Sequence, residues 1–227
     1  MRVPLLLLPG MDGTGRLFAP LIAALPPAVD PHPVAYPPDR PLDYDALLEF
    51  VRPLRPRGAW YLLGESFSGP LALRLAAERP PGLRGLVLAA TFAASPAPWA
   101  PRWLARPTLF TPAAARLAAR VLGAHRCGPG VAAMFRAANA SVAPAVLAAR
   151  ARAILDVDLR HLAPALADLP ALILAATRDR VVARRHTDRL AALLPHAAVR
   201  RLDAPHLLLQ ARPDEAAAAV AALMRLG

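Results

Sequence analysis

The sequence predicts a single α/β domain in which helices cover both faces of a mostly parallel sheet of about six strands. Three observations lead to this prediction. Short apolar runs alternate with helical patterns along most of the 227 residues. A hydrophobic content of 56% suits a packed core rather than a disordered chain. One long stretch, at about residues 92–168, breaks the alternation with helical patterns alone. We therefore expect one domain, residues 1–227, with a helical cap inserted at about 92–168.

Each predicted element follows from a local pattern. Apolar runs of strand length occur at residues 3–8, 33–36, 59–63, 86–90, 171–176 and 198–202. Apolar residues at helical spacing predict helices at 14–25, 44–54, 70–79, 184–194 and 213–226. Regular alternation of such strands and helices is typical of a parallel sheet that is buried on both faces.

The interrupting stretch begins with five prolines between residues 96 and 112 and continues with helical patterns at 113–122, 130–138 and 142–154. It follows the C-terminal end of a predicted strand. Open α/β sheets bind their ligands at that edge. We expect the three helices to form a cap over a functional site.

The net charge of +11 comes entirely from arginine, because the chain has no lysine. A basic surface can attract nucleic acid or anionic lipid. The arginines are nevertheless scattered, and no basic block is interleaved with aromatic residues. This pattern favours a solvated arginine surface, and we expect no nucleic-acid partner.

Several classes of protein are disfavoured by simple counts. No apolar run approaches the roughly 18 residues of a membrane span, so no integral membrane segment is expected. The apolar N-terminus is short and ends at Pro9-Gly10, which suits a first strand better than a signal peptide. Cys127 is the only cysteine, which excludes an internal disulfide and suits the cytoplasm. The histidines have no metal-ligand spacing, so no metal site is expected. The oligomeric state stays open.

The most informative segment is Gly64-Glu65-Ser66-Phe67-Ser68-Gly69, between a predicted strand and a predicted helix. A serine on such a sharp turn needs small neighbours and stands beside the helix N-terminus, where negative charge is favoured. Ser66 is therefore the candidate nucleophile. Ser68 occupies the position where this motif usually has its second glycine. A plain glycine turn with an incidental serine is the alternative.

Two later residues supply what a serine nucleophile needs. His206 follows the last predicted strand and is the candidate base, because imidazole titrates near neutral pH. Asp179 follows the preceding strand and is the candidate carboxylate that orients the imidazole. Asp179 lies between two arginines, so a surface ion pair is its alternative role. Asp203 is a rival carboxylate but lies very close to His206 in sequence.

The loop after the first strand, Pro9-Gly10-Met11-Asp12-Gly13-Thr14-Gly15, can bring backbone N–H groups close to Ser66. Such groups stabilise the oxyanion of acyl transfer. The expected donors are the N–H groups of Met11 and Phe67. Asp12 is expected to cap the following turn or helix. Glu65 has either a tuning role in the site or a structural one.

With these four elements, the chain resembles the α/β-hydrolase superfamily over nearly its full length. It is most similar to small capped esterases related to the pimeloyl-ester carboxylesterase and to lysophospholipase-like proteins. The resemblance implies the α/β-hydrolase fold, without the antiparallel edge strands of larger members, and the roles given above for Ser66, His206, Asp179, Met11 and Phe67. Pro9 replaces a histidine that is frequent in the family, which affects the shape of the oxyanion loop.

The cap supplies apolar residues that suit an ester with an acyl chain or another hydrophobic group. The expected substrate-binding residues are Trp99, Trp103, Phe110, Met134 and Phe135, although cap packing is the plainer role for most of them. We expect a serine carboxylesterase whose partner is a small-molecule ester and whose reaction needs neither a metal nor an organic cofactor. Two other enzymes remain alternatives, an acyltransferase and a thioesterase. The glycine-rich loop is also similar to one in the phytyl-ester synthases, which are acyltransferases. A ligand-binding module without enzymatic activity is a third.

Overall fold

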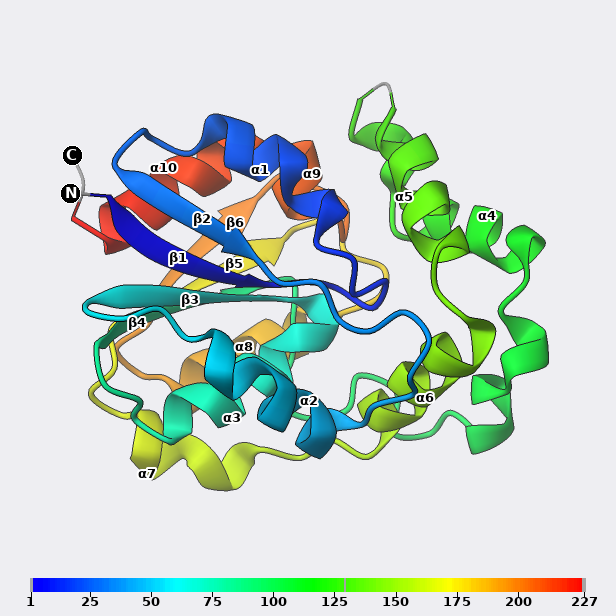
Figure 1. Cartoon of the computed structure of the whole chain (residues 1–227), viewed down its shortest axis with the longest axis horizontal. Helices are drawn as coiled ribbons and strands as arrows, with labels where there is room; N and C mark the ends of the chain where they lie inside the picture. The colour runs from blue at the N-terminus through cyan, green and yellow to red at the C-terminus, as the bar shows by residue number, and fades with distance from the viewer. Residues whose placement is uncertain (1, 129, 226–227) are drawn as a thin grey trace.

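The computed structural model describes residues 2–128 and 130–225, and its centre is a six-stranded sheet (Figure 1). The strands are β1 (Val3–Leu8), β2 (Val29–Pro33), β3 (Trp60–Glu65), β4 (Leu83–Ala89), β5 (Ala171–Ala176) and β6 (Ala198–Leu202). They lie in the order β2-β1-β3-β4-β5-β6, and each adjacent pair is parallel. The predicted α/β class with about six strands is confirmed.

Two hydrophobic cores lie on the two faces of this sheet. Successive side chains of a strand point to opposite faces. Leu6 and Leu8 accordingly belong to one core, and Leu5 and Leu7 belong to the other. Helices α2 (Tyr44–Val51), α3 (Gly69–Ala77) and α8 (Arg184–Leu193) cover the first face. Helices α1 (Ala19–Ala24), α9 (Leu208–Ala211) and α10 (Pro213–Leu223) cover the second (Figure 1).

The segment between β4 and β5 is helical, and most of it stands beyond the C-terminal ends of the strands (Figure 1). It contains α4 (Pro112–Val121), α5 (Val131–Ala140), α6 (Pro144–Leu155) and α7 (Ala163–Leu166). Helices α4 and α5 pack on each other, whereas α7 packs on α3. We use the word cap for residues 96–155, because the chain after them returns to the body of the molecule.

Seven short 3-10 turns complete the described structure. They are η1 (Arg16–Phe18), η2 (Arg52–Leu54), η3 (Ser66–Ser68), η4 (Arg102–Ala105), η5 (Pro107–Leu109), η6 (Ala124–Arg126) and η7 (Arg160–Leu162). No single helix in the described parts of the chain is long and apolar enough to cross a membrane. Helices α5 and α6 meet the criteria of length and composition only as a pair, bent by 103°.

Two predicted elements differ from the structure. The second strand is Val29–Pro33, not 33–36. It lies at an edge of the sheet, where prolines are tolerated, and Tyr36 beyond it bonds to Gly13 instead of pairing in the sheet. The helix predicted at 14–25 is only η1 followed by α1. Gly15 takes a left-handed φ of 71°, which delays the start of the helix.

Candidate active site

Ser66 lies on the turn from β3 to α3 with a φ of 49°, a left-handed conformation that is uncommon for a residue with a side chain. The turn is possible because its neighbours lack bulk. A Cβ at Gly64 would lie 2.7 Å from the Cβ of Ala72, and one at Gly69 would lie 1.9 Å from Oγ1 of Thr91. Thr91 Oγ1 also donates to the Ser66 carbonyl, which holds the turn from the side of β4.

Three side chains from separate loops meet at the C-terminal edge of the sheet. Ser66 Oγ lies 2.8 Å from Nε2 of His206, and Nδ1 of His206 lies 2.7 Å from Oδ2 of Asp179. The His206 and Asp179 side chains are only 3% and 4% exposed, whereas Ser66 is half-buried. A carboxylate can only accept, so Nδ1 of His206 carries the proton and Nε2 is left to accept from the Ser66 hydroxyl.

The other contacts of Asp179 and Asp203 distinguish the two candidate carboxylates. Oδ1 of Asp179 accepts from the backbone N–H groups of Val181 and Val182, at 2.8 and 2.9 Å, which orients the carboxylate toward His206. Asp203, the rival, forms an exposed ion pair with Arg178 at 2.9 Å. The hydrogen bonds therefore select Asp179 as the partner of His206.

The loop after β1 lies beside the serine turn, because β1 and β3 are adjacent and Leu8 pairs with Gly64. The Met11 N–H has no acceptor among the described residues. The Asp12 carboxylate accepts from the backbone N–H and the hydroxyl of Thr14, at 2.9 and 2.6 Å. Asp12 thus caps its own turn, in agreement with one of the two roles expected from the sequence. Phe67, the other expected donor, follows Ser66 directly on η3.

Arg150, which the sequence analysis missed, reaches this loop from α6 and is 2% exposed. Its guanidinium donates to the carbonyls of Met11, Asp12 and Pro37, at 3.0, 2.8 and 3.2 Å. The guanidinium also lies over the Tyr36 ring, 5.5 Å from its centroid. It fills the space beside Gly13, where a Cβ would be 2.4 Å from Nη1.

A chain of hydrogen bonds leads from Arg150 through two peptide groups of the loop to the N–H of Met11. The Asp12 carbonyl, which accepts from Arg150, shares its peptide group with the N–H of Gly13. That N–H donates to the Gly10 carbonyl at 2.9 Å, and the Gly10 carbonyl shares its peptide group with the N–H of Met11. Hydrogen bonds in a chain polarise one another. The positive charge of Arg150 is therefore linked to the Met11 N–H.

Ser68 is fully buried, and its hydroxyl donates to the Pro9 carbonyl. The Tyr36 hydroxyl in turn donates to Ser68 Oγ at 2.7 Å. Ser68 therefore links the serine turn to the loop after β1, a role that glycine at this position cannot perform. The Tyr44 hydroxyl donates to the Phe67 carbonyl at 2.7 Å and supports the turn from α2.

Glu65 is a buried carboxyl group next to Ser66, 4% exposed. The pKa of Glu65 is raised to about 7, mainly by burial and to a smaller extent by the nearby Asp12 carboxylate, while a hydrogen bond from Gln210 and the proximity of His206 oppose the shift. Gln210 Nε2 donates to Glu65 Oε1 at 3.0 Å and to the Leu17 carbonyl at 3.1 Å. Glu65 thus helps to connect the serine turn with η1 and α9.

The five expected substrate-binding residues fall in different places. Phe135 is buried in a cluster that also contains Leu17 and Leu207, and Met134 packs against it. Because Leu207 directly follows His206, this part of the cap lies near the three side chains. Phe110 packs on a small cluster within the cap, around Val146. Trp99 and Trp103 are 77% and 55% exposed.

The chain has clear structural relatives. The model of the Alpha/beta hydrolase family matches residues 5–220. A hydrolase from Pseudomonas aeruginosa PA01 is 25% identical, with a TM-score of 0.77 over 98% of this chain and 90% of that one. A thermophilic esterase from Thermogutta terrifontis is 21% identical, with a TM-score of 0.80 over 98% and 89%. An enol-lactonase from Burkholderia xenovorans LB400 is also 21% identical, with a TM-score of 0.78 over 99% and 92%. No curated protein matches the sequence.

Proposed function

We propose that this chain, which belongs to the alpha/beta hydrolase family, hydrolyses carboxylic esters with Ser66 as its nucleophile. The observation that carries the proposal is the hydrogen-bonded sequence Ser66–His206–Asp179, with Ser66 held at a positive φ above the sheet. These are the three groups that activate a serine hydroxyl for acyl transfer.

In the first half of the reaction, Ser66 Oγ attacks the ester carbonyl carbon while its proton moves to Nε2 of His206. Asp179 stabilises the imidazolium through its hydrogen bond to Nδ1. The carbonyl oxygen becomes negative and binds the N–H groups of Met11 and Phe67. The bond to the leaving oxygen then breaks, and His206 donates its proton to that oxygen. The products are an alcohol and an acyl-Ser66 ester.

In the second half, water takes the place of the alcohol. Nε2 of His206 removes a proton from the water as the water oxygen attacks the acyl carbon. The bond to Ser66 Oγ breaks, and His206 returns the proton to Ser66. The carboxylic acid leaves and the serine is regenerated.

Arg150 acts in both halves as a positioning residue. Its hydrogen bonds hold the loop that carries Met11, and its charge reaches the Met11 N–H through two peptide groups. A cation in a buried site interacts strongly with a developing negative charge. Arg150 therefore favours the tetrahedral intermediate more than the neutral substrate.

The substrate class follows from the groups next to His206. Phe135, Leu17 and Leu207 form a buried apolar cluster there. Apolar side chains beside the reacting groups favour the acyl chain of a hydrophobic ester. Esterases are among the structural neighbours, which is consistent with an ester substrate.

The test is hydrolysis of p-nitrophenyl acetate, butyrate and octanoate by the purified chain and by its Ser66→Ala variant. We expect turnover by the wild type and loss of at least a thousandfold in the variant, whose circular dichroism spectrum stays unchanged. A fluorophosphonate should label Ser66 and no other residue, as read by mass spectrometry. Equal turnover by both proteins, or a label elsewhere, would overturn the assignment.

Two added arms separate the alternative chemistries that use the same nucleophile. An alcohol acceptor added to the ester assay measures acyl transfer against hydrolysis. Acyl-coenzyme A in place of the oxygen ester measures thioester cleavage. A product ratio that favours transfer, or a faster reaction with the thioester, would reassign the chain to acyl transfer or thioester hydrolysis.

A further inference from the structure

The positive charge of the chain is concentrated in one segment. The 77 residues between Glu78 and Asp156 contain ten arginines and neither Asp nor Glu. The other 150 residues contain 17 arginines and 16 acidic residues, a net charge of only +1. A general preference for arginine would not remove every acid from one segment. The segment includes the whole cap.

The same part of the molecule exposes large apolar side chains. Six residues of the cap between positions 99 and 121 are exposed by more than two fifths: Trp99 (77%), Trp103 (55%), Leu104 (44%), Leu109 (43%), Leu117 (63%) and Val121 (44%). Elsewhere in the described chain, only Leu54 (44%) is a large apolar residue with this exposure, and Val181 (39%) comes just below it. These six residues lie in one stretch of the cap, from just before η4 to the end of α4. Exposed apolar patches mark sites of interaction.

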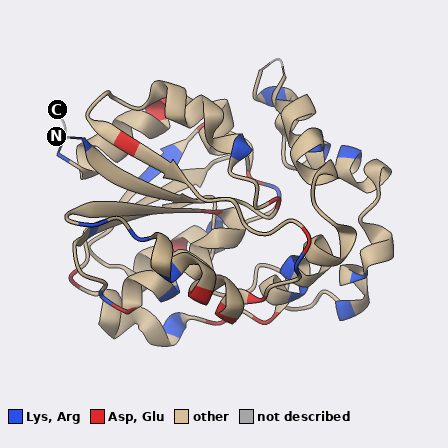
Figure 2. Cartoon of the chain, in the orientation of Figure 1, with Lys and Arg blue, Asp and Glu red and all other residues tan. Residues whose placement is uncertain are grey.

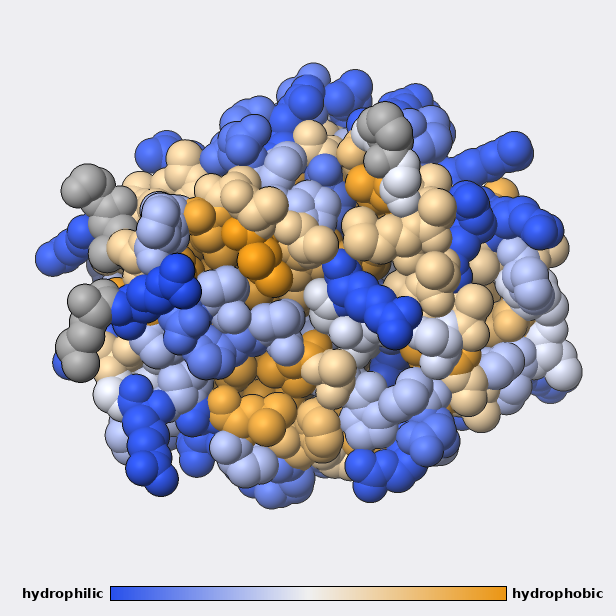
Figure 3. Space-filling model, turned by 45° about the horizontal axis from the view of Figure 1, so that its top comes forward, coloured by the Kyte–Doolittle hydropathy of each residue, from blue (hydrophilic) through white to orange (hydrophobic). Residues whose placement is uncertain are grey.

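Arginines alternate with these apolar residues. On α4, the exposed Arg116 and Arg120 stand one residue before Leu117 and Val121. Within the described residues, five exposed arginines of the cap contact no carboxylate: Arg106, Arg116, Arg120, Arg126 and Arg136. Figure 2 shows blue bands and no red on α4 and α5. Figure 3 shows apolar and hydrophilic residues mixed over this side of the molecule.

We propose that the outer surface of the cap, defined by Trp99, Trp103, Leu109, Leu117, Arg116 and Arg120, binds the surface of an anionic lipid membrane. Tryptophan suits the boundary between hydrocarbon and water, because its ring is apolar and its N–H is polar. An arginine can lay its alkyl stem along apolar surface while its guanidinium contacts a lipid phosphate. The interaction is peripheral and needs no spanning helix.

The lipid surface fits better than other anionic partners. Nucleic acid would use the arginines but would leave exposed leucines such as Leu109 and Leu117 without a partner. An anionic membrane satisfies both kinds of side chain at once. The inference is independent of the chemistry at Ser66, although a membrane is also a source of hydrophobic esters.

Binding can be measured with phosphatidylcholine vesicles prepared with and without phosphatidylglycerol. We expect the chain to sediment with the anionic vesicles and to dissociate as salt is added. Tryptophan emission should shift to the blue on binding. Trp60 is fully buried and donates to the Pro81 carbonyl, so the shift reports Trp99 and Trp103. No substrate is present, so the result does not depend on the proposed hydrolysis.

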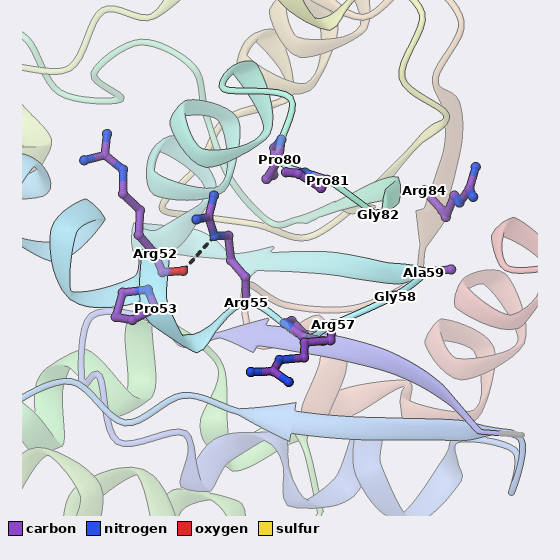
Figure 4. A pocket seen from close by; sticks show the side chains of 11 residues that line it. Arg52, Pro53, Arg55, Arg57, Gly58, Ala59, Pro80, Pro81, Gly82 and Arg84 are labelled. Carbon is purple, nitrogen blue, oxygen red and sulfur yellow. Dashed lines mark hydrogen bonds between the residues drawn. The ribbon is translucent and has the colours of Figure 1, made fainter.

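Three double variants make the test specific. Arg116→Gln with Arg120→Gln should weaken binding about 25-fold, roughly fivefold for each arginine. Trp99→Ser with Trp103→Ser should weaken it about tenfold or more. The control is Arg57→Gln with Arg84→Gln. These arginines border a depression of about 660 Å³ at the opposite end of β3 and β4, where their side chains point in different directions (Figure 4).

The control variant should bind as the wild type does, and all three variants should keep the wild-type melting temperature. The proposal is overturned if the vesicles bind equally with and without phosphatidylglycerol, or if the control weakens binding as much as Arg116→Gln with Arg120→Gln. It is overturned as well if soluble polyglutamate competes as effectively as anionic vesicles, because the partner would then be an acidic protein.

Discussion

Arg150 places a full positive charge inside the molecule, bonded to three backbone carbonyls and stacked on Tyr36. Burial lowers the pKa of its guanidinium, but arginine is not deprotonated in proteins. Burying a charge costs free energy. The charge lies next to the loop that carries Met11, and the proposed reaction develops a negative oxygen at the Met11 N–H. The guanidinium can therefore stabilise that oxygen through the loop.

This role predicts how Arg150→Met will behave. The substitution keeps much of the side-chain length but removes the charge and the donors. We expect kcat for p-nitrophenyl esters to fall about tenfold to a hundredfold while KM changes little, because the lost interaction acts on the oxyanion. Binding of a boronic acid, which forms a tetrahedral adduct with serine, should weaken by a similar factor.

Arg152→Met is the matched control on the same helix. Arg152 donates to the Ala105 carbonyl at 2.8 Å, within the cap, and does not contact the loop. Its kcat should stay near that of the wild type. Arg150→Lys, which keeps a charge and a donor, should fall between Arg150→Met and the wild type. If Arg150→Lys is as impaired as Arg150→Met, the positive charge does not contribute to catalysis. The proposed electrostatic link from Arg150 to the Met11 N–H is then wrong.

At the residue scale, the sequence offers candidates where a reaction needs particular side chains, and it gives no signal for contacts that only the fold creates. Ser66, Asp179 and His206 each follow a recognisable strand, so their meeting at one edge follows from a parallel sheet. Arg150 is 138 residues from Asp12 and has no local motif. In the sequence, Ser68 is only a small residue at a position that glycine usually occupies. The available signal was that a buried hydroxyl needs partners, and only the fold identifies them as Tyr36 and Pro9.

Among the elements, α5 connects the cap with the site through apolar packing, whereas α6 does so through Arg150. Its Phe135 packs in the cluster with Leu17, which follows the oxyanion loop, and Leu207, which follows His206. Helix α5 also packs on η1. A change in this cluster therefore affects the cap and the site together.

Phe135→Ala tests this connection. Removing a buried phenyl ring costs about 3–5 kcal/mol where the neighbours cannot collapse. We expect faster cleavage within residues 96–155 in limited proteolysis, and a KM that rises more for the octanoate ester than for the acetate. Leu117→Ala, at a side chain that is 63% exposed, should change neither result. A uniform loss of activity on all esters would show instead that the cluster supports the catalytic loops and not the acyl chain.

Elements with a clean period were predicted from the sequence, whereas the misplaced ones depend on tertiary contacts. Helices α4, α5 and α6 were expected within two residues of their observed bounds. The second strand was misplaced because Pro31 and Pro33 disguise it and because Val34 and Tyr36, which look like a strand, are buried in a loop instead. The position of β2 at the edge of the sheet explains why it tolerates two prolines and why the chain leaves the sheet after Pro33. A single sequence does not reveal which strand lies at the edge.

Over the whole molecule, the uneven distribution of charge is not visible from the arginines alone, because they are scattered along the chain. The excess of positive charge in one segment becomes clear only when acidic residues and arginines are counted together, segment by segment. Figure 2 shows where the charged residues lie in the fold. The segment that holds the excess is the one that the fold puts outside the C-terminal edge of the sheet. Charge and architecture thus single out the same face.

The pH dependence of stability is also a property of the whole chain, and Glu65 predicts its sign. In the unfolded chain this carboxyl has its ordinary pKa of 4.5, whereas burial raises the pKa to about 7 in the folded chain. Between these values the unfolded state releases the proton first, so the free energy of unfolding falls as the pH rises. Below pH 4.5 the contribution of Glu65 is fully present, and above about 7 it is lost.

Glu65→Gln removes this titration and keeps the shape of the side chain, including an oxygen that can accept from Gln210. We expect the variant to gain stability over the wild type from pH 4.5 toward pH 8, by an amount on the order of 3 kcal/mol if the whole shift is expressed. Thermal melts of both proteins across this range measure the difference.

Burial lowers the pKa of His186, so this group makes the free energy of unfolding rise with pH below its ordinary pKa of 6.5. His186 is present in both proteins, so its contribution cancels in the difference between them. Glu49→Gln, at a side chain that is 70% exposed, should show no such trend. A difference that shrinks as the pH rises would mean that ionised Glu65 is stabilised in the fold, and the assigned direction of its pKa shift would be wrong.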